Sequence, residues 1–93
     1  MADITMVKHH DLEIEVVRER LQELADWLKQ KYGIRARWQG DSCLLEGSGL
    51  KKGVVAISGS EVKVEVTLAM MAKFLKGQVE KEIGKKIDKI IQG

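Results

Sequence analysis

The side chains best suited to catalysis in this chain are one thiol, Cys43, and two adjacent imidazoles, His9 and His10. A thiol beside an imidazole can act as an activated nucleophile. No motif of a cysteine enzyme flanks Cys43, and a free cysteine is commonly a buried, inert apolar side chain. We therefore predict that the protein is not an enzyme and has no catalytic residue.

Metal and cofactor sites are equally weak candidates. Zinc ligands occur at short fixed spacings, and His9 and His10 lack companions at such spacings. The stretch 47–53 contains three glycines and two lysines, but a phosphate-binding loop ends in Gly-Lys-Ser/Thr and opens a helix. These glycines fall between predicted strands and indicate a hairpin turn. We predict no metal and no cofactor.

The charge pattern gives little sign of nucleic acid or membrane. The net charge is +2, and 44% of the residues are hydrophobic, which suits a soluble globular domain. Lysines on the last predicted helix could contact an anion, but Glu80, Glu82 and Asp88 dilute them, so we predict a solvated face and no nucleic acid. No apolar run reaches the roughly 20 residues that span a bilayer. With a single cysteine and no signal peptide at the start, the expected location is cytoplasmic.

The first elements that would position these groups are a strand and an amphipathic helix. Alternation over residues 4–9 predicts the strand. Asp11 is the predicted N-cap of a helix over residues 12–32, and Gly33 its left-handed end. The predicted buried stripe of this helix has spacings of three and four: Ile14, Val17, Leu21, Leu24, Leu28 and Tyr32, with Ala25 at its edge.

A meander of four short strands follows over residues 34–67. Alternating residues predict strands at 34–39 and 42–47, joined by a turn at Gly40-Asp41. A loose connection containing Lys51-Lys52 precedes a short, central strand at 54–57. The clearest alternation is that of Val62, Val64 and Val66 with charged residues.

The last predicted helix covers residues 68–91, and basic side chains flank it. Its predicted stripe comprises Leu68, Met71, Ala72, Leu75, Val79, Ile83, Ile87 and Ile90. The first helix has an acidic outer face, so we expect the two helices to complement each other in charge.

The sequence thus predicts one α+β domain over residues 1–93, in the order β-α-β-β-β-β-α. The sheet should be mostly antiparallel, because its strands are short and joined by turns. Two helices packed on one face would cover it, with the first strand beside the last strand.

Several apolar residues lie off the predicted stripes. Trp27 of the first helix and Met70 and Phe74 of the last are the main examples. Either the sheet or the first strand covers them, or they form a contact surface, with Lys73 on its rim. The candidate interaction surface is therefore Trp27, Met70, Lys73 and Phe74.

The order of short motifs resembles a small bacterial family, the putative polyhydroxyalkanoic acid system proteins. The matching positions are Lys8, His10, Leu12, Tyr32-Gly33, Trp38, Gly40-Asp41, Gly47, Gly49, Gly53, the run 62–68, Ile83 and Ile87-Asp88. Two departures are Ala69, where the family usually has glycine, and Leu44-Leu45, where an aromatic residue is common.

The resemblance implies a cytoplasmic, non-enzymatic accessory or binding protein of the polyhydroxyalkanoate storage system. The implied partners are the granule surface or granule-associated proteins, and a second copy of the chain is a further candidate. An alternative from architecture alone is a small helix-grip-like carrier that holds an apolar ligand among Trp38, Leu45, Val64 and Leu75. We expect His10 to cap or orient the start of the first helix.

Overall fold

The fold is described by a computed structural model for residues 2–92. Its elements are β1 (Ile4–His9), α1 (Ile14–Tyr32), β2 (Arg35–Gln39), β3 (Ser42–Glu46), β4 (Leu50–Ile57), β5 (Glu61–Leu68), the 3₁₀ segment η1 (Met70–Leu75) and α2 (Lys76–Ile91). The order is the predicted one, with η1 added before the last helix.

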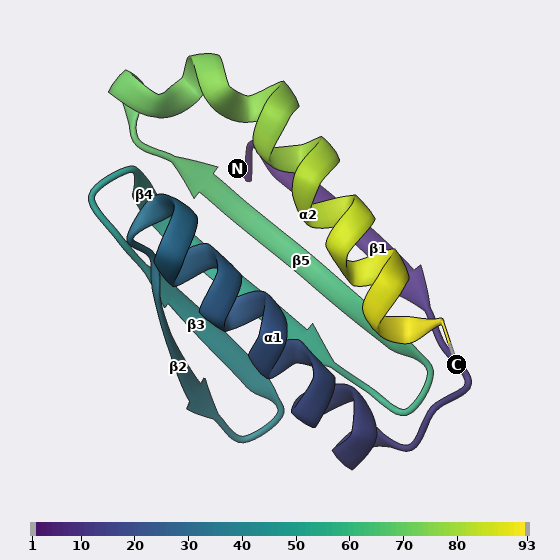
Figure 1. The fold of residues 1–93 in the computed structure, drawn as a ribbon. Coiled ribbons are helices and arrows are strands. Elements are labelled where there is room, and N and C mark those ends of the chain that lie inside the picture. The colour runs from purple at the N-terminus through teal and green to yellow at the C-terminus, as the bar shows by residue number, and fades with distance from the viewer. Residues whose placement is uncertain (1, 93) are drawn as a thin grey trace.

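The strands form one five-stranded sheet in the order β1-β5-β4-β3-β2. All four pairings are antiparallel. Figure 1 shows β1 alongside β5, although the two strands are far apart in the sequence. Ile4 lies opposite Val66 and Met6 opposite Val64. The predicted place of the first strand beside the last is confirmed.

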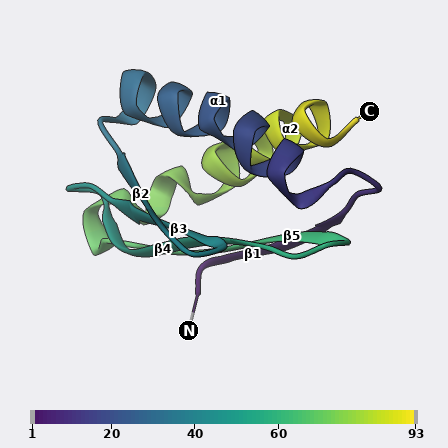
Figure 2. The ribbon, with the colours of Figure 1, turned by 90° about the horizontal axis from the view of Figure 1, so that it is seen from below.

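Both helices cover the same face of the sheet, as Figure 2 shows from below. They lie side by side. The Arg20 guanidinium of α1 donates a hydrogen bond to the Ile90 carbonyl oxygen near the end of α2, at 2.9 Å. The predicted α+β class, with two helices on one face of an antiparallel sheet, is confirmed.

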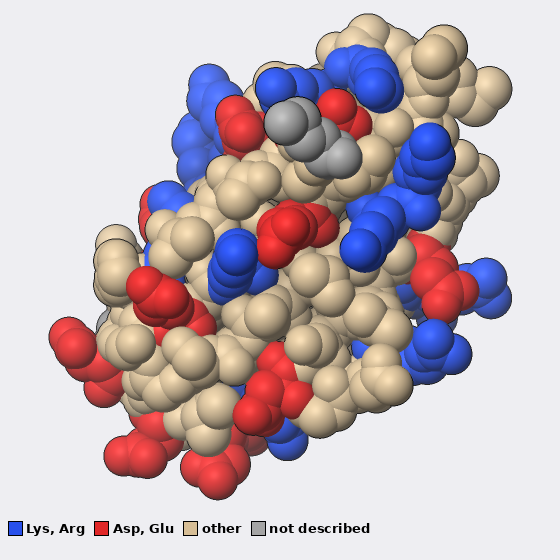
Figure 3. Space-filling view, turned by 180° about the vertical axis from the view of Figure 1, so that it is seen from behind, with Lys and Arg blue, Asp and Glu red and all other residues tan. Residues whose placement is uncertain are grey.

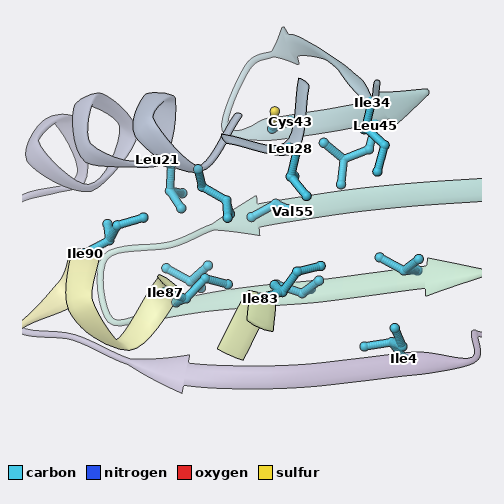
Figure 4. Close-up of a cluster of buried hydrophobic side chains, with 14 of the residues drawn as sticks. Ile4, Leu21, Leu28, Ile34, Cys43, Leu45, Val55, Ile83, Ile87 and Ile90 are labelled. Atoms are coloured by element: carbon cyan, nitrogen blue, oxygen red, sulfur yellow. The ribbon is translucent and has the colours of Figure 1, made fainter. Parts of the chain in front are cut away.

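The core fills the space between the sheet and the helices (Figure 4). Val62, Val64 and Val66 of β5 are at most 1% exposed. Burying one such side chain contributes about 1.5–3 kcal/mol. The helices add Val17, Leu21, Leu24, Ala25 and Leu28 from α1 and Val79, Ile83, Ile87 and Ile90 from α2, which confirms most of both stripes.

The start of α1 differs from the prediction. The helix begins at Ile14, its N-cap position falls on Glu13, and Asp11 is an exposed residue of the connection. The buried imidazole of His10 organises this connection instead. Its Nδ1 accepts from the Leu12 N–H at 3.1 Å, and its Nε2 lies 3.0 Å from the Ser58 carbonyl oxygen. The expected orienting role of His10 is confirmed, and Asp11 as N-cap is wrong.

The end of α1 is as predicted. Gly33 has φ 68°, which a residue with a Cβ adopts only with strain. At this turn the Gly33 N–H donates to the Lys29 carbonyl oxygen at 3.0 Å, the bond expected at a left-handed helix end. The Ile34 N–H donates to the Leu28 carbonyl oxygen at 3.3 Å.

β4 begins earlier than predicted, at Leu50, so Lys51-Lys52 belong to the strand. Its pairing with β5 is irregular between Leu50 and Lys52, which indicates a bulge. Gly53 is required for close packing, because a Cβ there would lie 2.9 Å from the Cβ of Leu45.

The segment after β5 also differs. Leu68 is the last residue of β5, where it pairs with Leu50, and the α-helix starts only at Lys76. Ala69 is extended, with φ −64° and ψ 152°, and its N–H donates to the Gly49 carbonyl oxygen. Pairing with β4 therefore overrides the helical spacing of this stretch. Met71 lies in solvent, so its assignment to the buried stripe is wrong.

The one ion pair between α1 and α2 among the described residues has the reverse of the expected polarity, whereas Glu23 of α1 lies near Lys86 and Lys89 of α2, as expected. Lys31 of α1 pairs with Glu82 of α2, at 2.5 Å between Nζ and Oε1. The expected pairing of an acidic α1 with a basic α2 is therefore wrong for this contact. Neither α1 nor α2 has the length and apolar content needed to cross a membrane.

Candidate functional site

The most exposed large apolar side chains of the described chain cluster on η1. Met70, Met71 and Phe74 are 86%, 79% and 82% exposed. A 3₁₀-helix has three residues per turn, so Met71 and Phe74 lie on the same side of the segment. A contiguous exposed apolar patch commonly marks an interaction site. These three side chains, with Lys73, are called the η1 surface below.

The η1 surface is held at the end of the sheet by Asp3. The Asp3 carboxylate accepts from the Leu68 N–H at 2.8 Å, and its other oxygen lies 3.7 Å from the Lys73 Nζ. The hydrogen bond from Leu68, together with Lys73 and Lys76, lowers the pKa of Asp3 below its ordinary value. The residue before β1 thereby fixes the point where η1 leaves β5.

A shallow apolar depression of about 170 Å³ lies beside η1. Its lining side chains come from the end of α1 and the residue that follows Gly33, the start of β4, the end of β5, η1 and α2: Tyr32, Ile34, Leu50, Leu68, Ala72, Leu75 and Val79. The volume is below the 300–1,000 Å³ of typical ligand pockets. Ala72 and Leu75 are the side chains of η1 that turn toward the protein, which leaves Met70, Met71 and Phe74 outside.

Basic side chains border the η1 surface. Lys73 and Lys76 are exposed at the junction of η1 and α2, and Lys51 follows Leu50, the partner of Leu68. In Figure 3, blue side chains border the tan, uncharged protrusion at the upper right, and red side chains dominate the lower left. The η1 surface is thus apolar with a cationic rim.

Trp27 does not join the η1 surface. Its half-buried ring lies between the helices, 5.3 Å from the Lys86 Nζ and 5.5 Å from the Lys31 Nζ, measured to the ring centroid. Ten helical residues, or about 15 Å at 1.5 Å per residue, separate Lys86 from the start of α2 at Lys76. Of the four predicted surface residues, the structure therefore groups Met70, Lys73 and Phe74 and places Trp27 elsewhere. Met71 was missed, because its helical spacing assigned it to the core.

The interior gives no support to an apolar-ligand carrier. The space between α1 and the sheet measures about 10 Å³, room for about one water molecule. Leu45 lines it together with Cys43 and Val55, whereas Leu75 lines the depression beside η1. Trp38 is half-buried and packs against the core, with Arg18 of α1 5.6 Å from its ring centroid.

Cys43 and His10, which were first considered for catalysis, each have a structural role. Cys43 is buried against α1, and burial raises the pKa of its thiol, which makes it a poor nucleophile. His10 has both ring nitrogens engaged with backbone groups. Within residues 2–92, the structure has no group of three or more His, Cys, Asp or Glu side chains that could hold a metal ion.

The fold and the η1 surface define a small two-layer α+β protein with an exposed apolar segment at one end of its sheet. The chain belongs to the putative polyhydroxyalkanoic acid system protein family, whose model matches residues 4–91. No curated protein and no solved structure matches it. The departure at Ala69 is harmless to the fold, because its extended backbone suits any residue.

Proposed function

We propose that this protein is a non-enzymatic, cytoplasmic accessory protein of the polyhydroxyalkanoate system that docks on the storage granule through the η1 surface. The observation that carries the proposal is the exposure of Met70, Met71 and Phe74 on one short segment. The family name supplies the context of polyester storage. An aliphatic polyester surface is apolar, and it matches these side chains in chemistry.

The energy available is adequate for reversible docking. Burying one Met or Phe side chain contributes about 1.5–3 kcal/mol, so three contribute several kcal/mol. Association costs offset part of this gain, which gives weak binding per molecule. Lys73, on the rim, would remain solvated and contact carboxylate end groups or anionic coat molecules.

The test is co-sedimentation with isolated granules. We expect Phe74→Asp to reduce the bound fraction at least about tenfold, because a carboxylate replaces the centre of the apolar contact. Val7→Asp is the matched control, since Val7 is also an exposed apolar residue but lies on β1 at the edge of the sheet. Equal binding by the wild type and Phe74→Asp would remove the η1 surface from the proposal.

Two further measurements separate the candidate partners. Binding to protein-free polyester particles supports the polymer surface, whereas binding only to native granules indicates granule-associated proteins. Light scattering of the pure protein tests a second copy of the chain as the occupant. A dimer that Phe74→Asp converts to a monomer would assign the η1 surface to self-association instead.

A further inference from the structure

A second surface lies in the groove between α1 and α2, away from η1. This groove is an open surface depression of about 510 Å³. Trp27 and Lys31 of α1 line one side, and Lys85, Lys86 and Lys89 of α2 line the other, together with Glu82, Asp88 and Gln92. We call it the inter-helix groove.

The acidic side chains of the inter-helix groove are already neutralised by other groups. Glu82 binds the Lys31 Nζ and accepts from the Tyr32 hydroxyl. Asp88 pairs with Lys8 of β1, at 3.1 Å. These carboxylates are therefore not available to the remaining lysines.

Three lysines of the groove remain without a carboxylate partner. Among residues 2–92, no Asp or Glu lies within ion-pairing distance of Lys85, Lys86 or Lys89. Lys85 and Lys89 are four residues apart on α2, where like charges lower helix stability. Lys86 extends over the Trp27 ring instead of toward a carboxylate. The groove thus presents three lysines without a carboxylate partner beside an aromatic surface.

We infer that the inter-helix groove binds a small ligand that carries two or more phosphate groups, with the phosphates among Lys85, Lys86 and Lys89 and the apolar part of the ligand against Trp27. Ammonium groups bind phosphate oxygens through charge-assisted hydrogen bonds. This site is independent of the η1 surface and of granule docking.

The surroundings favour a small ligand over a long polyanion. Glu23 lines an adjacent depression with Lys86 and Lys89. This carboxylate borders the cationic groove and would repel a polyanion that ran past its end. The whole chain has a net charge of only +2, too little for the basic stripe of a nucleic-acid-binding domain.

The experiment titrates ADP, pyrophosphate and adenosine into the protein at low salt by calorimetry. We expect ADP and pyrophosphate to bind and adenosine to bind at least tenfold more weakly, because it lacks the phosphates. In a Trp38→Phe background, in which Trp27 is the remaining tryptophan, ADP should change the fluorescence.

Matched variants test the residues. Lys86→Gln and Lys89→Gln should each weaken ADP binding about tenfold, as expected for the loss of one charge-assisted contact. Glu23→Gln should strengthen it a few-fold, because a repelling carboxylate is removed. Lys81→Gln is the control, since Lys81 is an exposed lysine of α2 outside the groove.

Three results would overturn the inference. They are no ADP binding at millimolar concentration, equal weakening by Lys81→Gln and Lys86→Gln, and tighter binding of a 20-nucleotide single strand than of ADP at the same salt. The last result would make the groove part of a nucleic-acid surface. Circular dichroism of each variant shows whether the fold is retained, and the opposite sign expected for Glu23→Gln separates ligand binding from loss of structure.

Discussion

Replacing His10 by alanine should destabilise the fold by about 2 kcal/mol. The imidazole is 6% exposed and joins two separate connections of the chain. Its Nδ1 accepts from Leu12 N–H at 3.1 Å, so its Nε2 carries the proton and donates to the Ser58 carbonyl oxygen at 3.0 Å. Each bond contributes about 0.5–1.5 kcal/mol net, which gives about 2 kcal/mol for the pair. For a domain of this size, that loss lowers Tm by about 8–16 °C.

Urea unfolding followed by far-ultraviolet circular dichroism measures this loss. His9→Ala is the matched control, because the side chain of His9 is exposed and its contact with Glu61 is a 3.5 Å surface pair. We expect that control to stay within about 0.5 kcal/mol of the wild type. His10→Asn should recover about half of the loss, since its amide oxygen can take the place of Nδ1 as acceptor from Leu12.

An unchanged unfolding midpoint for His10→Ala would refute the assignment of His10 as the organiser of this connection. Equal losses for His9→Ala and His10→Ala would also contradict it, because the argument depends on burial and two backbone bonds that only His10 has. Failure of His10→Asn to recover stability would shift the explanation from hydrogen bonding to packing of the ring.

Three further stability predictions follow from individual contacts. Gly53→Ala should lower the free energy of unfolding in urea by about 1–3 kcal/mol, because the new Cβ would lie 2.9 Å from the Cβ of Leu45. Gly84→Ala should raise it by up to about 1 kcal/mol, because alanine is the better helix former and its Cβ would meet only Met6, at 3.9 Å. A loss of stability for Gly84→Ala would contradict the second prediction. Burial and the hydrogen bond to Glu82 raise the pKa of Tyr32 from 10.0 to about 12. The folded state therefore holds this proton more tightly, and stability should fall as pH rises from about 10 to about 12. Tyr32→Phe should reduce that alkaline loss in melts across this range, and an identical pH profile would exclude the tyrosine as its cause.

Local patterns predicted the parts of the fold in which local preference and tertiary packing agree. The alternation of Val62, Val64 and Val66 gave a strand with one buried face, and those valines are buried. Gly33 ended α1 because its left-handed backbone is favourable only for glycine. The α2 stripe from Val79 onward was correct for the same reason: nothing in the sheet competes with the helix there.

The start of α1 could not be predicted in full, because the connection that leads into it is organised by His10, four positions before the helix. Asp11 satisfied the usual N-cap pattern. The bond that decides the geometry joins His10 to Ser58, 48 residues later, and that pairing depends on β1 lying beside β5. The surroundings of Trp27 could not be predicted for the same reason, because they depend on a segment distant in the sequence. Its spacing on α1 shows that it lies off the main stripe, but only the approach of α2 places Lys86 over its ring.

The stretch 68–75 shows why an exposed apolar segment can arise from an ordinary helical pattern. The spacing of a buried helix face is present at Leu68, Met71, Ala72 and Leu75. Leu68, however, belongs to β5 and pairs with Leu50 in the sheet, so no helix can begin there. The chain then leaves β5 in an extended conformation, and six residues of 3₁₀-helix precede α2. Met71 consequently points into solvent with Met70 and Phe74, where each gives up the stabilisation that burial would provide. Local and tertiary preferences disagree here, as they often do at functional sites. A partner that covered η1 would restore the lost burial, and this is the physical basis on which we propose docking at this end of the sheet.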